Sequence, residues 1–146
     1  RPNAAHDALA RLAGTGRLAP LVTQNVDRLH ARAGHRDVID LHGRLDLVRC
    51  LACGDTVRRA DLQAPLAAAN PDWVDRTATS APDGDADLDE ADFSRFVAPA
   101  CDRCGGLLKP DVVFFGENVP GERVEAALRE LAAADALLVL GSSLLV

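Results

Sequence analysis

Four cysteines occur in two identical pairs, and this arrangement constrains the fold more than any other feature of the chain. The pairs are Cys50-x-x-Cys53 and Cys101-x-x-Cys104, and a glycine follows each pair directly. Glycine permits the tight turn that points amide N–H groups at thiolate sulfurs. Two such turns supply four soft ligands for a tetrahedral Zn²⁺ ion, and a site closed by four thiolates has no position for a substrate. We therefore predict one structural zinc ion, held by Cys50, Cys53, Cys101 and Cys104.

Two disulfides or a pair of redox-active CxxC motifs are the alternatives for these cysteines. Either would have to explain why the pairs match and why no cysteine is left over. The sequence has no signal peptide and no apolar span of membrane length, so nothing indicates an oxidising compartment and we expect a cytoplasmic protein. Residues 54–100 separate the pairs, whereas a compact zinc ribbon has roughly 15 to 20 residues there. We therefore expect an insertion within the zinc module.

Length and charge narrow the class of protein further. The 146 residues suffice for one modest domain with a hydrophobic core. The chain begins at Arg1 without methionine and ends just after the apolar run 136–140, so we expect it to be part of a longer protein. Its formal net charge of −6 argues against nucleic acid, because phosphate binding needs a basic patch and the arginines are scattered among acids. We expect neither a nucleic-acid nor a membrane partner, and the oligomeric state stays open.

Helical and strand patterns alternate towards both ends of the chain. We predict helices over residues 3–13, over 29–33 with Asn25 as the N-cap, and from Pro120 to about Ala134. Predicted strands cover residues 18–23, 38–41, 111–115 and 136–140. Short strands separated by helices indicate βαβ units, so the predicted fold class is α/β with a mostly parallel sheet.

The middle of the chain does not continue the alternation of helical and strand patterns. We assign residues 44–108 to the zinc module, with an acidic insert at about residues 70–92. A solvated surface excursion is the simpler interpretation of this insert, and a lid or a partner-docking loop is the alternative. Trp73, the only tryptophan, is expected to anchor the insert rather than to bind a ligand.

Polar residues follow three of the predicted strands, at the strand ends where open α/β sheets bind ligands. Residues 23–27 offer amide and carboxylate groups for ribose hydroxyls or a carboxamide, although Asn and Asp are also ordinary helix caps. Gly141, Ser142 and Ser143 suit a phosphate or a ribose. His42 is followed by glycine, which leaves room for a ligand, and an imidazole with an ordinary pKa of about 6.5 suits a general base. No role is assigned to His6, His30 and His35.

These motifs, taken in order, resemble those of sirtuins, which are NAD-dependent protein lysine deacylases. The resemblance rests on residues 23–30, Leu41-His42-Gly43, the two CxxC pairs, residues 109–117 and residues 141–144. It runs through almost the whole chain. The long insert, with Asn70-Pro71-x-Trp73 and residues 81–85, is similar to the class II branch of that family.

The resemblance implies a role for each matching residue. Gln24 would contact the nicotinamide ribose, and Asn25, Val26 and Asp27 would line the nicotinamide pocket. His42 would be the catalytic base. The adenosine ribose and phosphates would lie against Gly141, Ser142 and Ser143. The four cysteines would hold structural zinc, in agreement with their spacing.

A substrate cleft is implied as well, where an extended acyl-lysine peptide adds as a strand between the domains. The residues that would flank it are Val113, Phe114, Phe115, Gly116 and Glu117. The implied architecture is a Rossmann-like parallel sheet with an inserted small zinc-binding domain that holds its metal with four cysteines. Residues 1–43 and 109–146 would form the partial Rossmann-like NAD-binding domain, and residues 44–108 the zinc module.

The implied reaction is NAD-dependent removal of acyl groups from protein lysines, giving nicotinamide, free lysine and O-acyl-ADP-ribose. An NAD-dependent ADP-ribosyltransferase, a non-catalytic zinc-containing binding module and an inactive enzyme with the same fold are the alternatives. Sirtuins also carry a glycine-rich strand turn and a Gly-Ile-Pro-Asp-Phe-Arg loop that covers NAD, and neither occurs in this chain. We therefore expect the 146 residues alone to bind NAD poorly and to have little activity.

Overall fold

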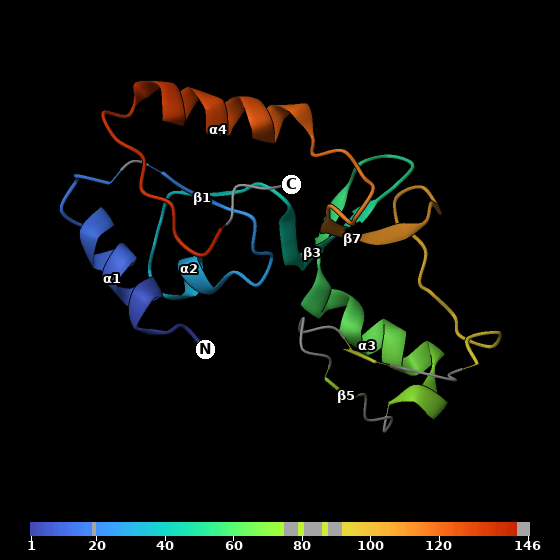
Figure 1. Ribbon diagram of the computed structural model, residues 1–146. Coiled ribbons are helices and arrows are strands. Elements are labelled where there is room, and N and C mark those ends of the chain that lie inside the picture. Colours follow the sequence, from blue (N-terminus) through green and yellow to red (C-terminus); the bar gives the residue numbers. More distant parts are fainter. Residues whose placement is uncertain (19, 75–78, 81–85, 88–91, 143–146) are drawn as a thin grey trace. The chain divides into compact units, whose positions relative to one another are not determined.

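The computed structural model describes residues 1–18, 20–74, 79–80, 86–87 and 92–142 (Figure 1). The chain forms two compact units. The first contains Arg1–Leu45 and Val112–Val146, and the second contains Asp46–Asp111. Among the described residues, no helix is long and apolar enough to cross a membrane.

A parallel pair of short strands lies at the centre of the first unit. β1 (Leu21–Thr23) pairs with β2 (Val38–Asp40), so that Thr23 lies opposite Asp40. The predicted parallel pairing is confirmed, but β1 is shorter than the predicted strand over 18–23. Pro20, which has no N–H to donate, directly precedes β1, and proline is typical of a strand start.

Helix α1 (Ala4–Ala13) confirms the helix predicted over residues 3–13. The side chain of Asn3 accepts hydrogen bonds from the N–H groups of Ala5 at 3.0 Å and His6 at 3.2 Å. The ring of His6 accepts in turn from the N–H of Asn3 at 3.3 Å, which completes a capping box. The amino end of α1 is therefore satisfied by two neighbouring side chains.

The second helix begins differently from the prediction. The N-cap residue of α2 (Leu29–Arg32) is Arg28, and the carboxylate of Asp27 before it accepts from the N–H of Leu29 at 2.9 Å, so the prediction of Asn25 as the cap is wrong. Asn25 is instead tied to Thr23, because its N–H donates to the Thr23 hydroxyl at 3.1 Å. Gly34, with φ of +98°, follows the C-cap residue Ala33.

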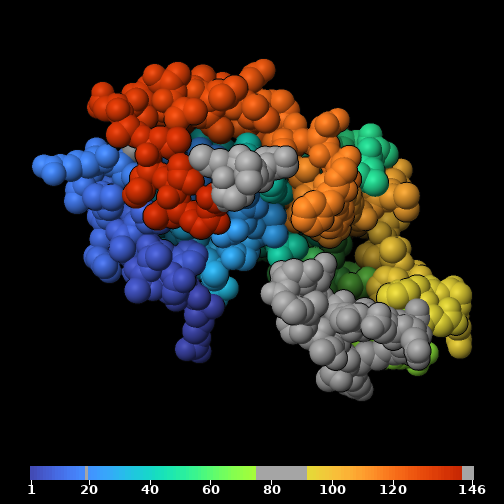
Figure 2. Space-filling model, viewed as in Figure 1, coloured from blue at the N-terminus to red at the C-terminus, as the bar shows by residue number. Residues whose placement is uncertain are grey.

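Helix α4 (Gly121–Ala133) confirms the predicted helix after Pro120, and it covers part of the surface of its unit (Figure 2, orange to red). Residues 136–140 form no strand, so that prediction is wrong. Leu137 and Leu138 are 65% and 64% exposed. A strand requires a neighbouring backbone to pair with its N–H and C=O groups, and apolar side chains alone do not supply one.

Three strands form the sheet of the zinc-module region in the order β4-β3-β7. They are β3 (Gly43–Cys50), β4 (Thr56–Arg58) and β7 (Leu108–Val112). β3 and β4 are antiparallel, with Val48 opposite Val57. Among the described residues, the buried apolar side chains are Val48, Cys50 and Cys101, so the core of this unit surrounds the cysteines.

The predicted strand over residues 111–115 lies earlier in the chain, since β7 ends at Val112. A turn follows, in which the N–H of Glu117 donates to the carbonyl of Phe114 at 3.0 Å. The N–H of Phe114 donates to the Glu117 carboxylate at 2.9 Å. These bonds occupy backbone groups that a longer strand would need.

Helix α3 (Arg59–Ala69) leads to the insert, followed by the 3-10 turn η1 (Pro71–Trp73) and the short antiparallel strands β5 (Thr79–Ser80) and β6 (Ala86–Asp87). Trp73 stacks on Phe93 with ring centroids 4.9 Å apart and meets the ring of Phe96 edge-on at 5.2 Å. The predicted anchoring role of Trp73 is therefore confirmed. Most acidic residues of the predicted insert lie outside the described residues, namely Asp75, Asp83, Asp85, Asp89 and Glu90.

Candidate metal centre and active site

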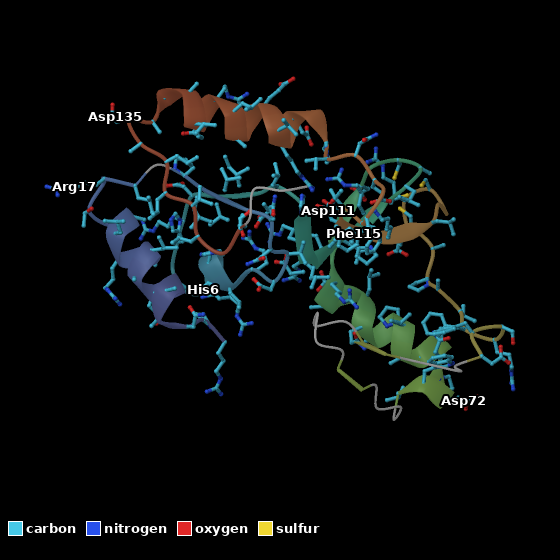
Figure 3. The ribbon with its side chains drawn as sticks, viewed as in Figure 1. His6, Arg17, Asp72, Asp111, Phe115 and Asp135 are labelled. Atoms are coloured by element: carbon cyan, nitrogen blue, oxygen red, sulfur yellow. The ribbon has the colours of Figure 1, made fainter. Side chains whose placement is uncertain are left out.

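The four cysteines converge in the second unit, where their sulfur atoms are drawn yellow in Figure 3. All four Sγ atoms lie within 4.8 Å of one another. Cys50 and Cys104 are 3.5 Å apart at sulfur, and Cys53 and Cys101 are 3.9 Å apart. All four thiols are free, so the disulfide alternative is wrong. A tetrahedral ion with Zn–S bonds of about 2.3 Å separates its ligands by about 3.8 Å, which matches this spacing.

Both cysteine pairs adopt the same turn. Gly54 and Gly105 have φ of +74° and +73°, a conformation that favours glycine. Their N–H groups donate to the carbonyls of Cys50 at 3.0 Å and Cys101 at 2.7 Å. The two turns are joined by one further bond, from the N–H of Leu51 to the carbonyl of Leu107 at 2.9 Å.

Gly106 leaves room for the sulfur atoms. A Cβ atom at this position would lie 2.9 Å from the sulfur of Cys50, 3.2 Å from that of Cys104 and 2.7 Å from the Cβ of Ala52. The first and last of these distances are shorter than real Cβ contacts. Gly106 was not among the predicted site residues. The second glycine directly after the Cys101–Cys104 pair is the sequence signal that could have indicated it.

The surroundings shift the pKa values of two of the thiols in opposite directions. Hydrogen bonding from the Cys53 N–H, with smaller help from Ala52 and the neighbouring thiols, lowers the pKa of Cys50 to about 6 despite its burial. The Gly106 N–H acts to lower the pKa of Cys104, but the sulfurs of Cys53 and Cys50, burial and Cys101 together raise it to about 12. Thiolates this close repel one another, and a divalent cation would remove that repulsion. The four sulfurs and the Gly106 backbone therefore fit a closed tetrathiolate zinc site.

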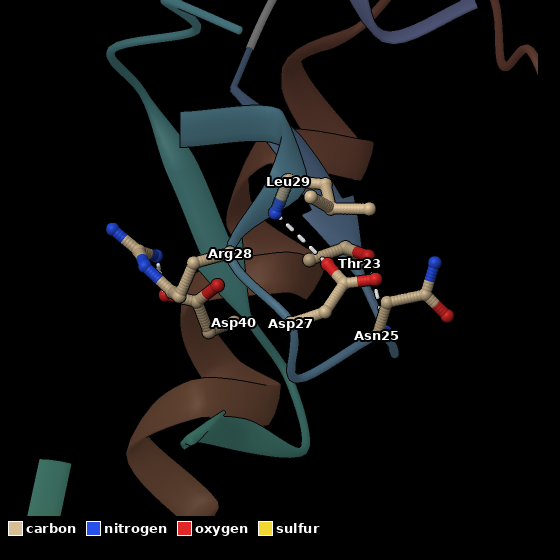
Figure 4. A network of polar contacts seen from close by, with 6 residues as sticks. All are labelled: Thr23, Asn25, Asp27, Arg28, Leu29 and Asp40. Atoms are coloured by element: carbon tan, nitrogen blue, oxygen red, sulfur yellow. Dashed lines mark hydrogen bonds and ion pairs between the residues drawn. The ribbon is translucent and has the colours of Figure 1, made fainter. Parts of the chain in front are cut away.

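A second group of polar residues lies at the carboxyl end of β1 (Figure 4). Thr23 is buried, and its carbonyl accepts from the N–H of Leu41 at 2.9 Å while its hydroxyl accepts from Asn25. These bonds fix the backbone where the chain leaves the strand. The side chains of Gln24, Asn25 and Asp27 are exposed, and Val26 is half-buried.

His42 follows the end of β2, and two backbone hydrogen bonds connect its surroundings. Its carbonyl accepts from the N–H of Val113 at 2.8 Å, and the N–H of Leu45 donates to the carbonyl of Val26 at 2.9 Å. The imidazole is half-buried. The loop of residues 24–27, His42 and the start of residues 113–117 are thus held together by backbone bonds within one unit.

The predicted substrate-flanking residues are accessible. Phe115 is fully exposed and is labelled in Figure 3, and Phe114 is 49% exposed. Gly116 has φ of +85° in the turn, Glu117 is exposed and Val113 is half-buried. Strand β7 gives way to a turn here, so Phe114 and Phe115 are exposed in a turn and do not belong to a regular strand.

The third predicted cluster follows residues 136–140, which do not form the strand expected to carry it. Gly141, with φ of +66°, and Ser142 are exposed. Ser143 lies outside the described residues. The roles of Gly141, Ser142 and Ser143 stay predictions.

One cavity of about 260 Å³ lies beside β2 and the start of α4. It is lined by Ile39, Asp40, Gly43, Arg44, Glu122, Arg123 and Ala126. Neither His42 nor the residues 24–27 line it. It is therefore distinct from the predicted nicotinamide pocket.

Comparisons with known proteins match the whole chain. A family model described as "Sir2 family" matches residues 1–146. "NAD-dependent protein deacetylase 2" of Bradyrhizobium diazoefficiens is 62% identical over 146 residues, which are 100% of this chain and 54% of that protein. The "NAD-dependent protein deacetylase" of Bordetella bronchiseptica is 63% identical over 145 residues, 99% of this chain and 53% of that protein. The chain spans about half the length of the curated relatives it matches.

Solved structures agree. "Sir2 bound to acetylated peptide" matches with a TM-score of 0.72 and 33% identity, over 99% of this chain and 50% of that one. "Crystal structure of a Sir2 homolog-NAD complex" matches with a TM-score of 0.64 and 38% identity, over 92% of this chain and 41% of that one. The α/β fold with a parallel pair and a four-cysteine module is the fold of these structures.

Proposed function

The chain belongs to the Sir2 family, and from this premise we propose that it forms the catalytic part of an NAD-dependent protein lysine deacylase, a transferase acting on acyl-lysine. The observation that carries the proposal is the backbone arrangement around His42. The N–H of Val113 donates to the His42 carbonyl, and β1, which leads into the polar loop, pairs with β2, which leads to His42. The backbone therefore connects His42, with its half-buried imidazole, to the polar loop and to the exposed apolar turn. Relatives of this chain that are described as NAD-dependent protein deacetylases support the same activity.

Residues 24–27 fit the nicotinamide end of NAD by the chemistry of their side chains. Gln24 and Asn25 each carry an amide that both donates and accepts, which complements a carboxamide and ribose hydroxyls. One Asp27 oxygen accepts from Leu29, so the carboxylate is already oriented before any ligand binds. Val26 contributes an apolar wall. Gly141, Ser142 and Ser143 would meet the adenosine ribose and phosphates.

His42 acts as the single base. When bound, NAD supplies an activated ribose carbon that accepts the acyl oxygen of the substrate as nicotinamide departs. A ring nitrogen of His42 would take the proton of a ribose hydroxyl, which is the role of a general base.

The acyl-lysine peptide would lie along residues 113–117. Phe114 and Phe115 offer exposed apolar surface for the aliphatic lysine stem and the acyl group. The backbone before the turn can pair with an extended peptide, as in strand addition. The acetylated-peptide complex of a similar Sir2 protein supports a peptide as the substrate.

The zinc ion would have a structural role. Four thiolates fill its coordination sphere, so no water or substrate can bind to it. We assign residues 44–108 to this zinc module, and residues 1–43 and 109–146 to the partial NAD-binding domain. Four reduced cysteines are typical of a reducing compartment, which favours the cytoplasm.

The test is product analysis on the complete protein that carries residues 1–146, incubated with NAD and a panel of acyl-lysine peptides. We expect nicotinamide, deacylated peptide and O-acyl-ADP-ribose in equal amounts, identified by mass. A peptide that gains the mass of ADP-ribose would instead indicate an ADP-ribosyltransferase. No consumption of NAD by a folded, zinc-loaded protein would indicate a binding module or an inactive enzyme and would overturn the proposal.

A further inference from the structure

Arg28 has an unusual backbone conformation at the end of the polar loop. Its φ is +63°, and among the described residues it is the one non-glycine residue with positive φ. This left-handed region is unfavourable for a residue with a Cβ atom, and it persists where other interactions hold the chain in it. Glycine would adopt it freely, so the side chain of Arg28 is expected to serve a purpose there.

That side chain forms an ion pair with Asp40. Nη1 of Arg28 donates to Oδ2 of Asp40, and the side chains are only 20% and 13% exposed (Figure 4). An ion pair shielded from water in this way is weakened less by salt than the exposed pair of Arg58 and Asp61, whose side chains are 75% and 52% exposed.

The pair connects the loop to the strand that carries the proposed base. Asp40 is the last residue of β2, lies opposite Thr23 in the sheet and precedes His42 by two positions. Residues 24–27 therefore lie between two fixed residues. Thr23, before the loop, is hydrogen-bonded to Leu41, and Arg28, after the loop, is bonded to Asp40. Both ends of the loop are fixed to the same segment of chain, at the end of β2.

We infer that the Arg28–Asp40 ion pair is a positioning device, which holds residues 24–27 in the conformation that receives the nicotinamide end of NAD. The inference rests on the proposed function. Arg28 touches neither substrate nor base in this account. It acts through the loop, by fixing Asp27 and its neighbours at a constant position relative to His42. A preformed loop lowers the cost of ordering it when the ligand binds.

Arg28→Gly is the informative variant, because glycine accepts the positive φ and the change removes the side chain that forms the ion pair. If the competent loop conformation falls to about one tenth of the population, the apparent affinity for NAD falls about tenfold. We therefore expect KM for NAD to rise about tenfold, with kcat changed less than about twofold. Arg28→Lys, which keeps the charge, should recover part of the loss. The effects of Arg28→Gly and Asp40→Asn should add incompletely, since both variants lose the Arg28–Asp40 ion pair.

A readout independent of activity is amide hydrogen exchange of residues 24–27 in the protein without NAD. We expect faster exchange in Arg28→Gly and unchanged exchange in the control Arg58→Ala, which removes the exposed pair that Arg58 forms with Asp61 of α3. Unchanged exchange together with an unchanged KM in Arg28→Gly would overturn the inference. A comparable rise in KM, fall in kcat and fall in thermal stability would also overturn the inference, because the pair would then have a general structural role. Absence of deacylation by the wild-type protein would count against the proposed function, whereas the exchange result would still decide the role of the pair.

Discussion

At the scale of single residues, Gly106 shows how closely the backbone packs against the cysteine sulfurs. Its missing side chain leaves the space in which Cys50 and Cys104 approach each other. A methyl group there would have to displace a ligand atom or the turn that carries it. The metal centre therefore depends on a residue that is not itself a ligand.

Gly106→Ala is expected to weaken zinc binding strongly, because the new Cβ would lie 2.9 Å from the Cys50 sulfur. The measurement is zinc retention against a competing chelator. Gly121→Ala is the matched control, since a Cβ at Gly121 meets nothing within 4 Å. Equal zinc retention by both variants would contradict the packing described for Gly106.

His30 makes stability depend on pH. Burial lowers its pKa, His6 and His35 lower it further, and Asp27 and Asp40 oppose the shift. The folded state therefore binds the proton more weakly than the unfolded chain, whose histidine has a pKa of about 6.5. The contribution of neutral His30 to stability is complete above about pH 6.5 and is lost as the pH falls below that value towards the lowered pKa.

Urea unfolding at pH 7.5 and 5.5, in the wild type and in His30→Gln, measures this effect. We expect the wild type to lose more stability than the variant over this interval. Protonation of the cysteines destabilises both proteins alike, so the difference between them reports on His30. Identical losses would show that His30 does not titrate differently in the folded state.

At the scale of helices and strands, local sequence predicted the elements whose signals are local. Residues 3–13 and 120–134 were predicted as helices because their signals are local: Asn3 and Gly14 bound the first, and Pro120 begins the second. The strand over 111–115 was misplaced and the strand over 136–140 was wrong, because a strand is defined by a partner that is distant in sequence. The Arg28–Asp40 pair was missed for the same reason, since only the register of β1 with β2 brings these residues together.

Asn70 illustrates an element held by one buried side chain. It is 4% exposed, donates to the carbonyls of Leu66 and Val97, each at 2.8 Å, and accepts from the N–H of Val97 at 2.7 Å. These bonds join the end of α3 to the segment that returns from the insert. The rings of Trp73, Phe93 and Phe96 connect the same two segments through one stacked contact and two edge-on contacts.

Asn70→Ala should lower the free energy of unfolding by about 2 to 3 kcal/mol, because it leaves buried backbone groups without partners. Asn3→Ala, which removes an exposed helix cap from α1, should cost about 1 kcal/mol. Urea denaturation of both variants with zinc present gives the comparison. A smaller loss for Asn70→Ala than for Asn3→Ala would contradict the described role of Asn70.

At the scale of the whole molecule, the four-cysteine cluster and the residues of the proposed chemistry belong to different compact units. The cysteines and Gly106 belong to residues 46–111, whereas His42 and the polar loop belong to the unit with the parallel pair. The cysteine spacing and the histidine at a strand end were both visible in sequence, since each is a short motif. The order of the motifs predicted the family that the whole-chain comparisons show.

The most direct test of the account is the rate of NAD-dependent deacylation by His42→Ala in the complete protein. Loss of a general base typically costs 10²- to 10⁴-fold, so we expect a decrease of about that size with unchanged zinc content and thermal stability. Arg58→Ala should keep the wild-type rate, because Arg58 has no role in the proposed reaction and forms an exposed ion pair with Asp61. A His42→Ala rate within about threefold of the wild type, well short of the loss expected for a general base, would contradict the assignment of His42 and with it the proposed reaction.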